Sequence, residues 1–442
     1  MMKKHILSCA ALCAGLFLAM TGCTSEISIG EMSVETSVST ISTTIATSAP
    51  AQTSTTIPAT TEASSTISTT VTSLLTSTAM VATLKTNSAV TKPTTVTTTA
   101  APSDLDYKNQ TPQQILDQMT LEQKVAQMLM ISCHSKGADT YAAKHGAGAL
   151  CLYADAFANK SKQQVCNMTA NLQELSELPL LISVDEEGGG VTRISSNPQL
   201  RASKFLRPAQ LYANGGWELV TSDTLEKAQL LLSLGVNVNL APVCDIPLSK
   251  NDYIYNRCFS MNAEDTSEYA TRVVSTMKQQ GIGSTLKHFP GYGGSADTHK
   301  GMGYDTRPYA DFQESDLKPF KAGIQAGADS VLVSHNIVKC MDANNPASLS
   351  YAVHDLLRNT IGFQGVIITD DLGMDAIIQF CGTENAAVKA VEAGNDLLCC
   401  PNFDEAYHAI LQAAKSGRIS ESRINTSVLR ILKWKQNLSL LD

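Results

Sequence analysis

The first hundred residues of this 442-residue chain lack almost everything that a folded core requires. Between Ser33 and Ser103 there is no aromatic residue, and only 4 of the 71 residues are charged, whereas 37 are serine or threonine. A segment of this composition cannot bury enough apolar surface to offset the entropy lost on ordering. We therefore expect a disordered tract here and a folded unit over positions 104–442.

The chain also lacks a basic stripe of the kind that binds nucleic acid. Its net charge is −8, and positions 1–103 carry 4 basic and 4 acidic residues, so the acidic excess lies entirely in the folded part. An acidic domain without such a stripe argues against nucleic acid as a partner. Small or neutral substrates are compatible with this charge, and the oligomeric state is left open.

The amino terminus has the pattern of a secretory signal. Two lysines precede an apolar run over 6–20, which is too short for a membrane-spanning helix and ends in small residues before Cys23. Small residues directly before a cysteine resemble the lipobox of bacterial lipoproteins. We expect a signal peptide over 1–22, lipidation of Cys23 at the outer face of the bacterial cell membrane, and a serine/threonine-rich tether over 23–103. Ordinary secretion is the alternative.

Several familiar motifs are missing from the folded part. There is no C-x-x-C pair, no G-x-S-x-G elbow, no H-x-H or H-E-x-x-H, and no G-x-G-x-x-G after the first expected strand. We expect no cofactor and no metal, and mostly buried thiols among the nine cysteines after Cys23. A metal-dependent barrel hydrolase stays open as an alternative, with His288, His299, His335 and Asp370 as its ligands.

Short apolar runs alternate with amphipathic stretches throughout the folded part. The runs are rich in β-branched residues or leucine and do not alternate with polar residues, as is typical of strands that are covered on both faces. Eight such strands separated by helices favour a (β/α)₈ TIM-type barrel over an open sheet. The expected strands are Met128–Cys133, Gly148–Tyr153, Leu178–Val184, Val236–Val243, Gly283–His288, Ser330–Ser334, Gly365–Thr369 and Asp396–Cys400.

Ionisable residues lie at the carboxyl ends of five of these strands. They are Asp185, Asp245, the pair Lys287 and His288, His335, and Asp370. A barrel collects the carboxyl ends of its strands around one mouth, where catalytic residues lie. One such residue could be a helix cap, but five that converge predict an active site.

Glycoside cleavage requires a carboxylate nucleophile and a proton donor on either side of the scissile bond. Asp370 is the nucleophile candidate because it is the first polar residue after an apolar strand. Asp297 and His299 lie two residues apart on a glycine-rich loop, and an extended chain points both side chains the same way. A carboxylate beside the imidazole fixes its tautomer and stabilises its protonated form, which suits a general acid. Asp371 is expected to cap a helix over 372–380.

Several ordered motifs resemble those of bacterial β-N-acetylglucosaminidases of glycoside hydrolase family 3, over essentially all of positions 104–442. The motifs are Lys287-His-Phe-Pro-Gly-Tyr-Gly-Gly-Ser-Ala-Asp-Thr-His299, Asp185-Glu-Glu-Gly-Gly-Gly-Val-Thr-Arg193, Asn256-Arg257-Cys-Phe259, Ser334-His335 with Pro346-Ala-Ser-Leu-Ser350, and Gly365 to Met374.

The resemblance implies a role for each matching residue. Asp370 forms the glycosyl-enzyme intermediate, and His299 is the acid/base assisted by Asp297. The N-acetylglucosamine in the −1 subsite is bound by Asp185, Arg193, Arg257, Lys287 and His288. Two departures stand out, because Tyr292 occupies the place of a usual second histidine and Gly190 that of a common arginine.

These observations predict a retaining exo-β-N-acetylglucosaminidase that acts on peptidoglycan fragments or other N-acetylglucosaminides. A phosphorylase is an alternative, since a histidine acid/base carries no negative charge that would repel phosphate. A mechanism that uses the acetamido group with Asp185 and Glu186 requires two neighbours on one face, which a strand does not provide. A non-catalytic, cell-wall-binding lipoprotein is the alternative from another functional class.

Overall fold

The computed structural model describes residue 105 and residues 107–381 and 383–442 of the chain. The predicted signal peptide, Cys23 and the serine/threonine-rich tract lie outside the described residues, so these features stay predictions. Within the described ranges, no helix combines the length and the apolar composition needed to cross a membrane.

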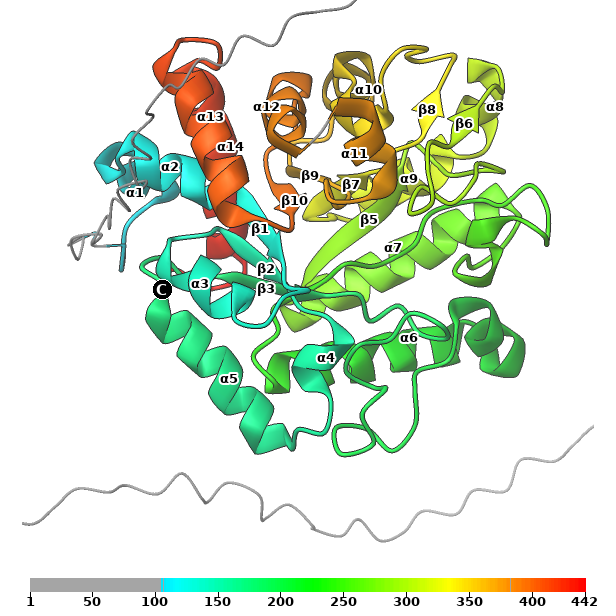
Figure 1. Ribbon diagram of the computed structural model, residues 1–442. Coiled ribbons are helices and arrows are strands. Elements are labelled where there is room, and N and C mark those ends of the chain that lie inside the picture. Colours follow the sequence, from blue (N-terminus) through cyan, green and yellow to red (C-terminus); the bar gives the residue numbers. More distant parts are fainter. Residues whose placement is uncertain (1–104, 106, 382) are drawn as a thin grey trace, which may run out of the picture. The chain divides into compact units, whose positions relative to one another are not determined.

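Eight parallel strands form one sheet in the order β10-β1-β2-β3-β4-β5-β7-β9, so neighbouring strands follow the chain around the sheet (Figure 1). All eight predicted strands are confirmed, most of them shorter than expected. Their bounds are β1 (Leu129–Ser132), β2 (Ala149–Cys151), β3 (Leu181–Val184), β4 (Val238–Asn239), β5 (Gly283–Phe289), β7 (Ser330–Val333), β9 (Val366–Thr369) and β10 (Leu398–Cys400).

The first and last strands of this order meet and close the sheet. Ile368 of β9 forms a parallel bridge with Leu397, which directly precedes β10. The Thr369 hydroxyl accepts a hydrogen bond from the Cys399 amide at 2.9 Å. The sheet is therefore a nearly closed (β/α)₈ barrel, as the alternation of strands and helices predicts.

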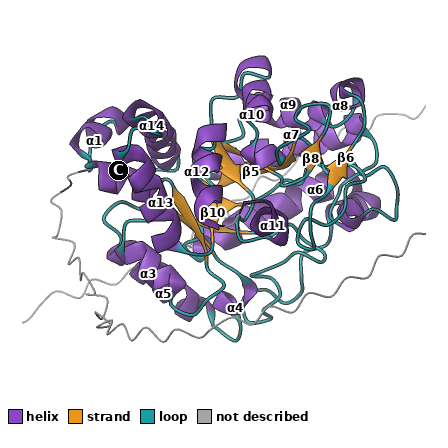
Figure 2. Ribbon diagram, turned by 45° about the horizontal axis from the view of Figure 1, so that its top comes forward, coloured by secondary structure: helices purple, strands orange, loops and turns teal. Residues whose placement is uncertain are grey.

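Helices surround the barrel in the order expected for β/α units (Figures 1 and 2). They are α1 (Pro112–Gln118), α2 (Leu121–Gln127), α3 (Ala138–Lys144), α4 (Ala154–Phe157), α5 (Lys162–Leu175), α6 (Pro208–Ser233), α7 (Ala263–Gln280), α8 (Tyr309–Glu314), α9 (Leu317–Gln325), α10 (Tyr351–Asp355), α11 (Asp375–Cys381), α12 (Thr383–Ala393), α13 (Phe403–Lys415) and α14 (Glu421–Asn437). A separate two-stranded sheet pairs β6 (Tyr304–Asp305) with β8 (Ile337–Val338).

The core consists of the apolar strands and the inner faces of these helices. Strands β1, β3, β7 and β9 are buried at every position, which explains why their sequences do not alternate. Trp434 of α14 is also buried and belongs to this core. The barrel is thus a packed core, and the site lies at its mouth rather than along its axis.

Helix α6 begins at Pro208 and continues across a kink at Gly215 and Gly216, where Gly216 has a φ of 61°. One predicted helix boundary is wrong. The helix after Asp371 begins at Asp375 instead of Leu372. The Asp371 carboxylate accepts the amide of Gly373 in a turn, so it does not cap the helix as predicted.

Candidate active site

An open cavity of about 460 Å³ lies at the carboxyl ends of the barrel strands. Its lining comes from β1, β2, β5, β7 and β10 and from the loops that follow β1, β2, β3, β4, β5, β9 and β10. The sequence-predicted residues that line it are Asp185, Arg193, Arg257, Lys287, His288, His299 and Asp370. Asp297 is not in the lining, but it contacts His299 at the rim, so the structure brings all eight predicted residues into one region.

Lys287 is the centre of an ion-pair network on one wall of this cavity. Its Nζ lies 2.7 Å from Asp185 Oδ1 and 2.7 Å from Glu187 Oε1, and only 2% of the side chain is exposed. Arg193 Nη2 contacts the other oxygen of Asp185 at 3.1 Å. A buried lysine requires such partners, because an unpaired charge in this position would carry a large desolvation cost.

The charges of this network stabilise one another. Burial disfavours an ionised Asp185, but Lys287 and Arg193 outweigh burial and hold the pKa of this carboxyl below its ordinary value. Burial likewise disfavours an ionised Glu187, yet Arg257 and Lys287 lower its pKa to about 2. The two carboxylates in turn raise the pKa of Lys287 against the effect of burial. All members are therefore charged at neutral pH.

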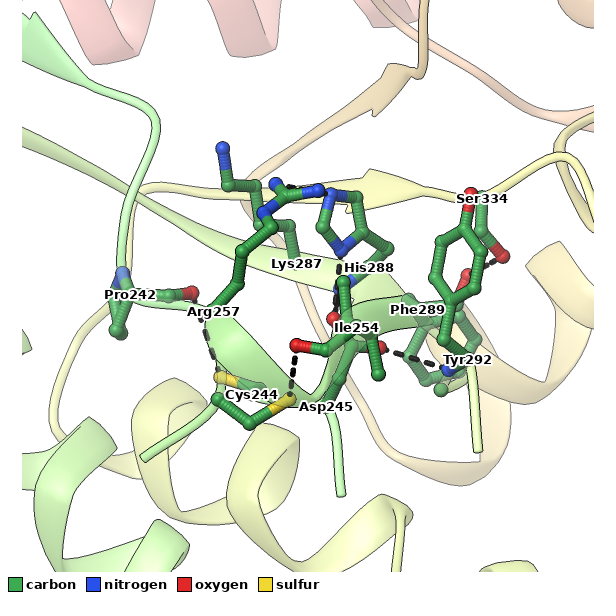
Figure 3. A network of polar contacts seen from close by, with 12 residues as sticks. Pro242, Cys244, Asp245, Ile254, Arg257, Lys287, His288, Phe289, Tyr292 and Ser334 are labelled. Carbon is green, nitrogen blue, oxygen red and sulfur yellow. Dashed lines mark hydrogen bonds and ion pairs between the residues drawn. The ribbon is translucent and has the colours of Figure 1, made fainter. Parts of the chain in front are cut away.

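Arg257 extends the network to His288, which follows Lys287 on β5 (Figure 3). Its Nε and Nη2 form a bidentate pair with the Glu187 carboxylate at 3.0 and 2.7 Å, and Nη2 lies 3.1 Å from His288 Nε2. The opposite ring nitrogen, Nδ1 of His288, lies 2.7 Å from Asp245 Oδ2. Asp245 is fully buried, and its contact with Nδ1 fixes the orientation of the His288 imidazole.

Glu186 points away from the cavity, as alternation along an extended segment requires. Its carboxylate accepts hydrogen bonds from the amides of Arg193 and Ile194 at 2.8 and 2.7 Å and from the Ser195 hydroxyl. Asp185 and Glu187 face Lys287, whereas Glu186 fixes the backbone of the following loop. The mechanism that pairs Asp185 with Glu186 at one sugar finds no support in this geometry.

Asp370 follows β9 directly and projects into the cavity beside the network. Its neighbour Asp371 contacts His134 Nε2 at 3.4 Å, and this hydrogen bond lowers the pKa of Asp371 although burial raises it. His335 is buried, and its Nδ1 and Nε2 lie 2.7 Å from Ser348 Oγ and 2.9 Å from the Asp371 carbonyl oxygen. His335 therefore holds the backbone next to Asp370 instead of facing a substrate.

The Asp297–His299 pair has the geometry that the sequence predicts. His299 Nδ1 lies 2.8 Å from Asp297 Oδ1, which also accepts the His299 amide at 3.1 Å. Burial opposes ionisation of Asp297, but these hydrogen bonds from His299 lower its pKa. The His299 side chain is 57% exposed at the rim of the cavity. Because Nδ1 is engaged, Nε2 is the ring nitrogen left for proton transfer.

The ligands suggested for a metal-dependent hydrolase do not form one cluster. In the ranges that the structure describes, no three His, Cys, Asp or Glu side chains are grouped so as to hold a metal ion. His288 contacts Asp245, whereas His335 contacts Ser348. The nine cysteines of the described ranges are free, and six of them are buried, as expected for core thiols.

With this geometry in place, comparison with known proteins decides the family. A family model described as the glycosyl hydrolase family 3 N terminal domain matches residues 120–434. The chain belongs to glycosyl hydrolase family 3. It is therefore a glycoside hydrolase, and the cavity at the mouth of the family 3 barrel is its candidate active site.

Individual relatives agree with this assignment. A protein of Stenotrophomonas maltophilia named beta-hexosaminidase is 36% identical over 262 residues, which cover 57% of this chain and 76% of the relative. A family 3 beta-N-acetylglucosaminidase structure from Paenibacillus is 33% identical with a TM-score of 0.68, over 73% of this chain and 63% of the other. A beta-N-acetylhexosaminidase structure from Beutenbergia cavernae is 25% identical with a TM-score of 0.64, over 72% and 99%.

The sequence reasoning missed three residues of this family 3 site. Glu187 shares Lys287 with Asp185, and its position two residues after Asp185 was the available signal. Asp245 was recognised at a strand end but given no role, although it holds His288. Tyr253 lines the cavity with its hydroxyl 3.5 Å from His299 Nδ1, and no local pattern indicated this contact.

Proposed function

We propose that this family 3 enzyme is a retaining exo-β-N-acetylglucosaminidase that hydrolyses terminal N-acetyl-β-D-glucosaminides. The observation that carries the proposal is that Asp370 and the Asp297–His299 pair lie at one cavity beside a wall of paired charges. A nucleophile, a proton donor and a polar wall for the sugar are the parts that retaining glycoside hydrolysis requires. Peptidoglycan fragments and chitooligosaccharides are the substrates that we propose.

In the first step, an Asp370 oxygen attacks the anomeric carbon, and the bond from this carbon to the aglycone oxygen breaks. The electron pair of that bond stays on the aglycone oxygen, which takes the proton from His299 Nε2. In the second step, His299 removes a proton from water, whose oxygen attacks the anomeric carbon and releases the Asp370 carboxylate. Asp297 stabilises the imidazolium before the first step and after the second.

The charged wall explains selection for a sugar rich in polar groups. The side chains of Lys287, Arg193 and Arg257 are donors already fixed by carboxylates, so binding costs little additional ordering. We propose that these donors, with Asp185 and His288, bind the hydroxyl and acetamido groups in the −1 subsite. A sugar that lacks one of these groups would leave a buried partner unpaired, which is the basis of selectivity.

The test is hydrolysis of a chromogenic N-acetyl-β-glucosaminide, and of the matching β-glucoside, by the wild type, Asp370→Asn and His299→Ala. We expect the wild type to prefer the N-acetylated substrate and to release the β-anomer first. His299→Ala should lose about 10²- to 10⁴-fold in rate, the usual contribution of general acid–base catalysis. Full activity of Asp370→Asn, or an α-anomer as first product, would contradict the covalent mechanism.

A phosphorylase is the second candidate, because the acid/base at this site is an imidazole. An imidazole carries no negative charge against an incoming phosphate. The same assay with added phosphate separates the two reactions. Sugar phosphate as the main product would assign phosphorolysis, and inactivity of the wild type on all substrates would favour a binding protein.

We further propose that the enzyme is anchored by a lipid on Cys23 at the outer face of the bacterial membrane, with 23–103 as its tether. The basic, then apolar, then small-residue pattern before Cys23 supports this proposal. The test is incorporation of a labelled fatty acid into the wild type and into Cys23→Ser. Label in the variant, or a wild type found wholly in the medium, would contradict the anchor.

A further inference from the structure

The loop that carries the proposed acid/base has one buried residue between its two catalytic members. Thr298 is fully buried, whereas the side chain of His299 next to it is 57% exposed. Asp297 and His299 contact each other on one side of the loop, and Thr298 points to the other side, into the protein. The loop is thus exposed where it acts and anchored one residue away.

Two contacts fix Thr298 in place. Its hydroxyl forms a hydrogen bond with the hydroxyl of Tyr292, whose side chain is buried. Its carbonyl oxygen accepts the amide of Ala376, near the start of α11, at 3.3 Å. Of these two anchors, only the first depends on side chains, and Tyr292 is one of the two departures from the motifs that the sequence otherwise resembles.

Tyr292 is itself held by the sugar-binding side of the site (Figure 3). Its amide donates to Asp245 Oδ1 at 2.8 Å, while the other oxygen of Asp245 lies 2.7 Å from His288 Nδ1. The rings of Tyr292 and His288 meet edge to face, with centroids 5.3 Å apart. Tyr292 therefore connects a residue of the −1 wall to the loop that bears His299.

We propose that the hydrogen bond between the Tyr292 and Thr298 hydroxyls positions the Asp297–His299 loop for protonation of the leaving group. The inference rests on the proposed function and assigns to Tyr292 the role of a positioning residue rather than a catalytic one. Burial and the nearby Asp370 raise the pKa of Tyr292, so its hydroxyl stays protonated and the bond persists at the working pH of the enzyme.

The rate of proton transfer depends on the distance between His299 Nε2 and the leaving oxygen. Proton transfer needs the acid within about 2.6–3.2 Å of the leaving oxygen, so small displacements of an exposed imidazole are costly. Without the hydroxyl contact, the loop keeps the Ala376 bond to the Thr298 carbonyl and the Ser295 amide bond to the Tyr292 carbonyl, but it loses the side-chain contact next to His299. The loss should matter most where the leaving group depends on protonation, because a good leaving group departs without an acid.

The experiment compares Tyr292→Phe and Thr298→Val with the wild type on two N-acetyl-β-glucosaminides, a dinitrophenyl and an alkyl glycoside. Tyr292→Phe keeps the ring against His288, and Thr298→Val keeps the side-chain shape of Thr298. We expect each variant to lose about tenfold or more in kcat/KM on the alkyl glycoside, less than the 10²- to 10⁴-fold loss of His299→Ala. On the dinitrophenyl glycoside the loss should be less than about threefold.

Three readouts distinguish positioning from a general structural effect. The double variant should be no worse than either single variant, because both remove the same bond. Thr298→Ser, which keeps the hydroxyl, should restore most of the activity on the alkyl glycoside. Tyr269→Phe is the matched control, since Tyr269 is a buried tyrosine stacked on Phe259 outside the cavity lining, and it should match the wild type.

An equal loss on both glycosides would overturn the inference, because it would place Tyr292 in sugar binding. Unchanged activity of Tyr292→Phe, or additive losses in the double variant, would overturn it as well. If the wild type hydrolyses neither substrate, the proposed function itself fails. The two failures are therefore distinguishable.

Discussion

Replacing Glu187 with glutamine removes one of the two carboxylates that neutralise Lys287 and the only one paired with Arg257. The side chain of Glu187 is 2% exposed, so the two cations cannot exchange this partner for water. Breaking a buried ion pair by removal of one member costs about 3–5 kcal/mol. The lowered pKa gives a similar figure, because the difference between about 2 and the ordinary 4.5 corresponds to about 3 kcal/mol at neutral pH.

The assay is thermal unfolding followed by circular dichroism. An unfolding entropy of about 2.1 cal/mol/K per residue over a barrel of about 340 residues converts 3–5 kcal/mol into a Tm lowered by about 4–7 °C. Ionised Glu187 stabilises the fold fully above about pH 4.5, and this contribution disappears as the pH falls toward 2. The difference between wild type and variant should therefore shrink in acid.

Glu226→Gln is the matched control, because Glu226 pairs with Arg201 at 2.8 Å but its side chain is 55% exposed. Exposed pairs contribute at most about 1 kcal/mol, so this variant should unfold within about 1–2 °C of the wild type. Equal Tm values for Glu187→Gln and the wild type at pH 7 would refute the reasoning. A penalty that does not change between pH 7 and pH 3 would refute its electrostatic part.

Four further predictions concern stability. Burial lowers the pKa of His335, so the folded state favours the neutral ring and loses stability as the pH falls below about 6.5; His335→Gln should reduce that pH dependence in Tm measurements. Gly148→Ala would place a Cβ 2.0 Å from the Gln127 carbonyl oxygen and should cost at least about 1–3 kcal/mol in denaturant unfolding. Gly190→Ala meets no neighbouring atom and should change stability by less than about 0.5 kcal/mol. Burial lowers the pKa of Lys435 to about 7, so the wild type gains stability as the pH rises from about 7 to 10.5; Lys435→Met should remove this gain, and a Tm that still rises with pH in the variant as it does in the wild type would contradict it.

The barrel was predictable because its strands are buried on both faces. Such strands have continuous apolar sequences, and each ends where the chain returns to solvent at the mouth. Residues that follow strand ends, such as Asp185 and Asp370, must then meet at the mouth of the barrel, and this does not depend on the conformation of the loops. The close pairing of Asp297 with His299 was predictable as well, since it depends on two residues separated by one position.

The remaining features depend on contacts between distant segments. Asp245 meets Tyr292 across 47 residues, and Glu187 meets Arg257 across 70, so no local pattern encodes either contact. The start of α11 was misplaced because the Asp371 carboxylate binds Gly373 and His134 instead of a helix end. Tertiary packing determines which of several polar groups a carboxylate binds. The conformational preferences of single residues do not contain this information.

The seam between β9 and β10 has a consequence for how the barrel opens. Besides the single bridge, backbone hydrogen bonds cross this seam from Leu397 N to Ile367 O at 3.1 Å, from Thr369 N to Leu397 O at 3.2 Å and from Leu372 N to Cys399 O at 2.9 Å, and the Thr369 hydroxyl accepts the Cys399 amide. Amide hydrogens along this seam should therefore exchange with deuterium about as slowly as those between β5 and β7. Asp370 directly follows β9, and its own amide donates to Val333 O of β7 at 3.0 Å, so the backbone of the proposed nucleophile is held from both sides and activity on heating should be lost together with the barrel.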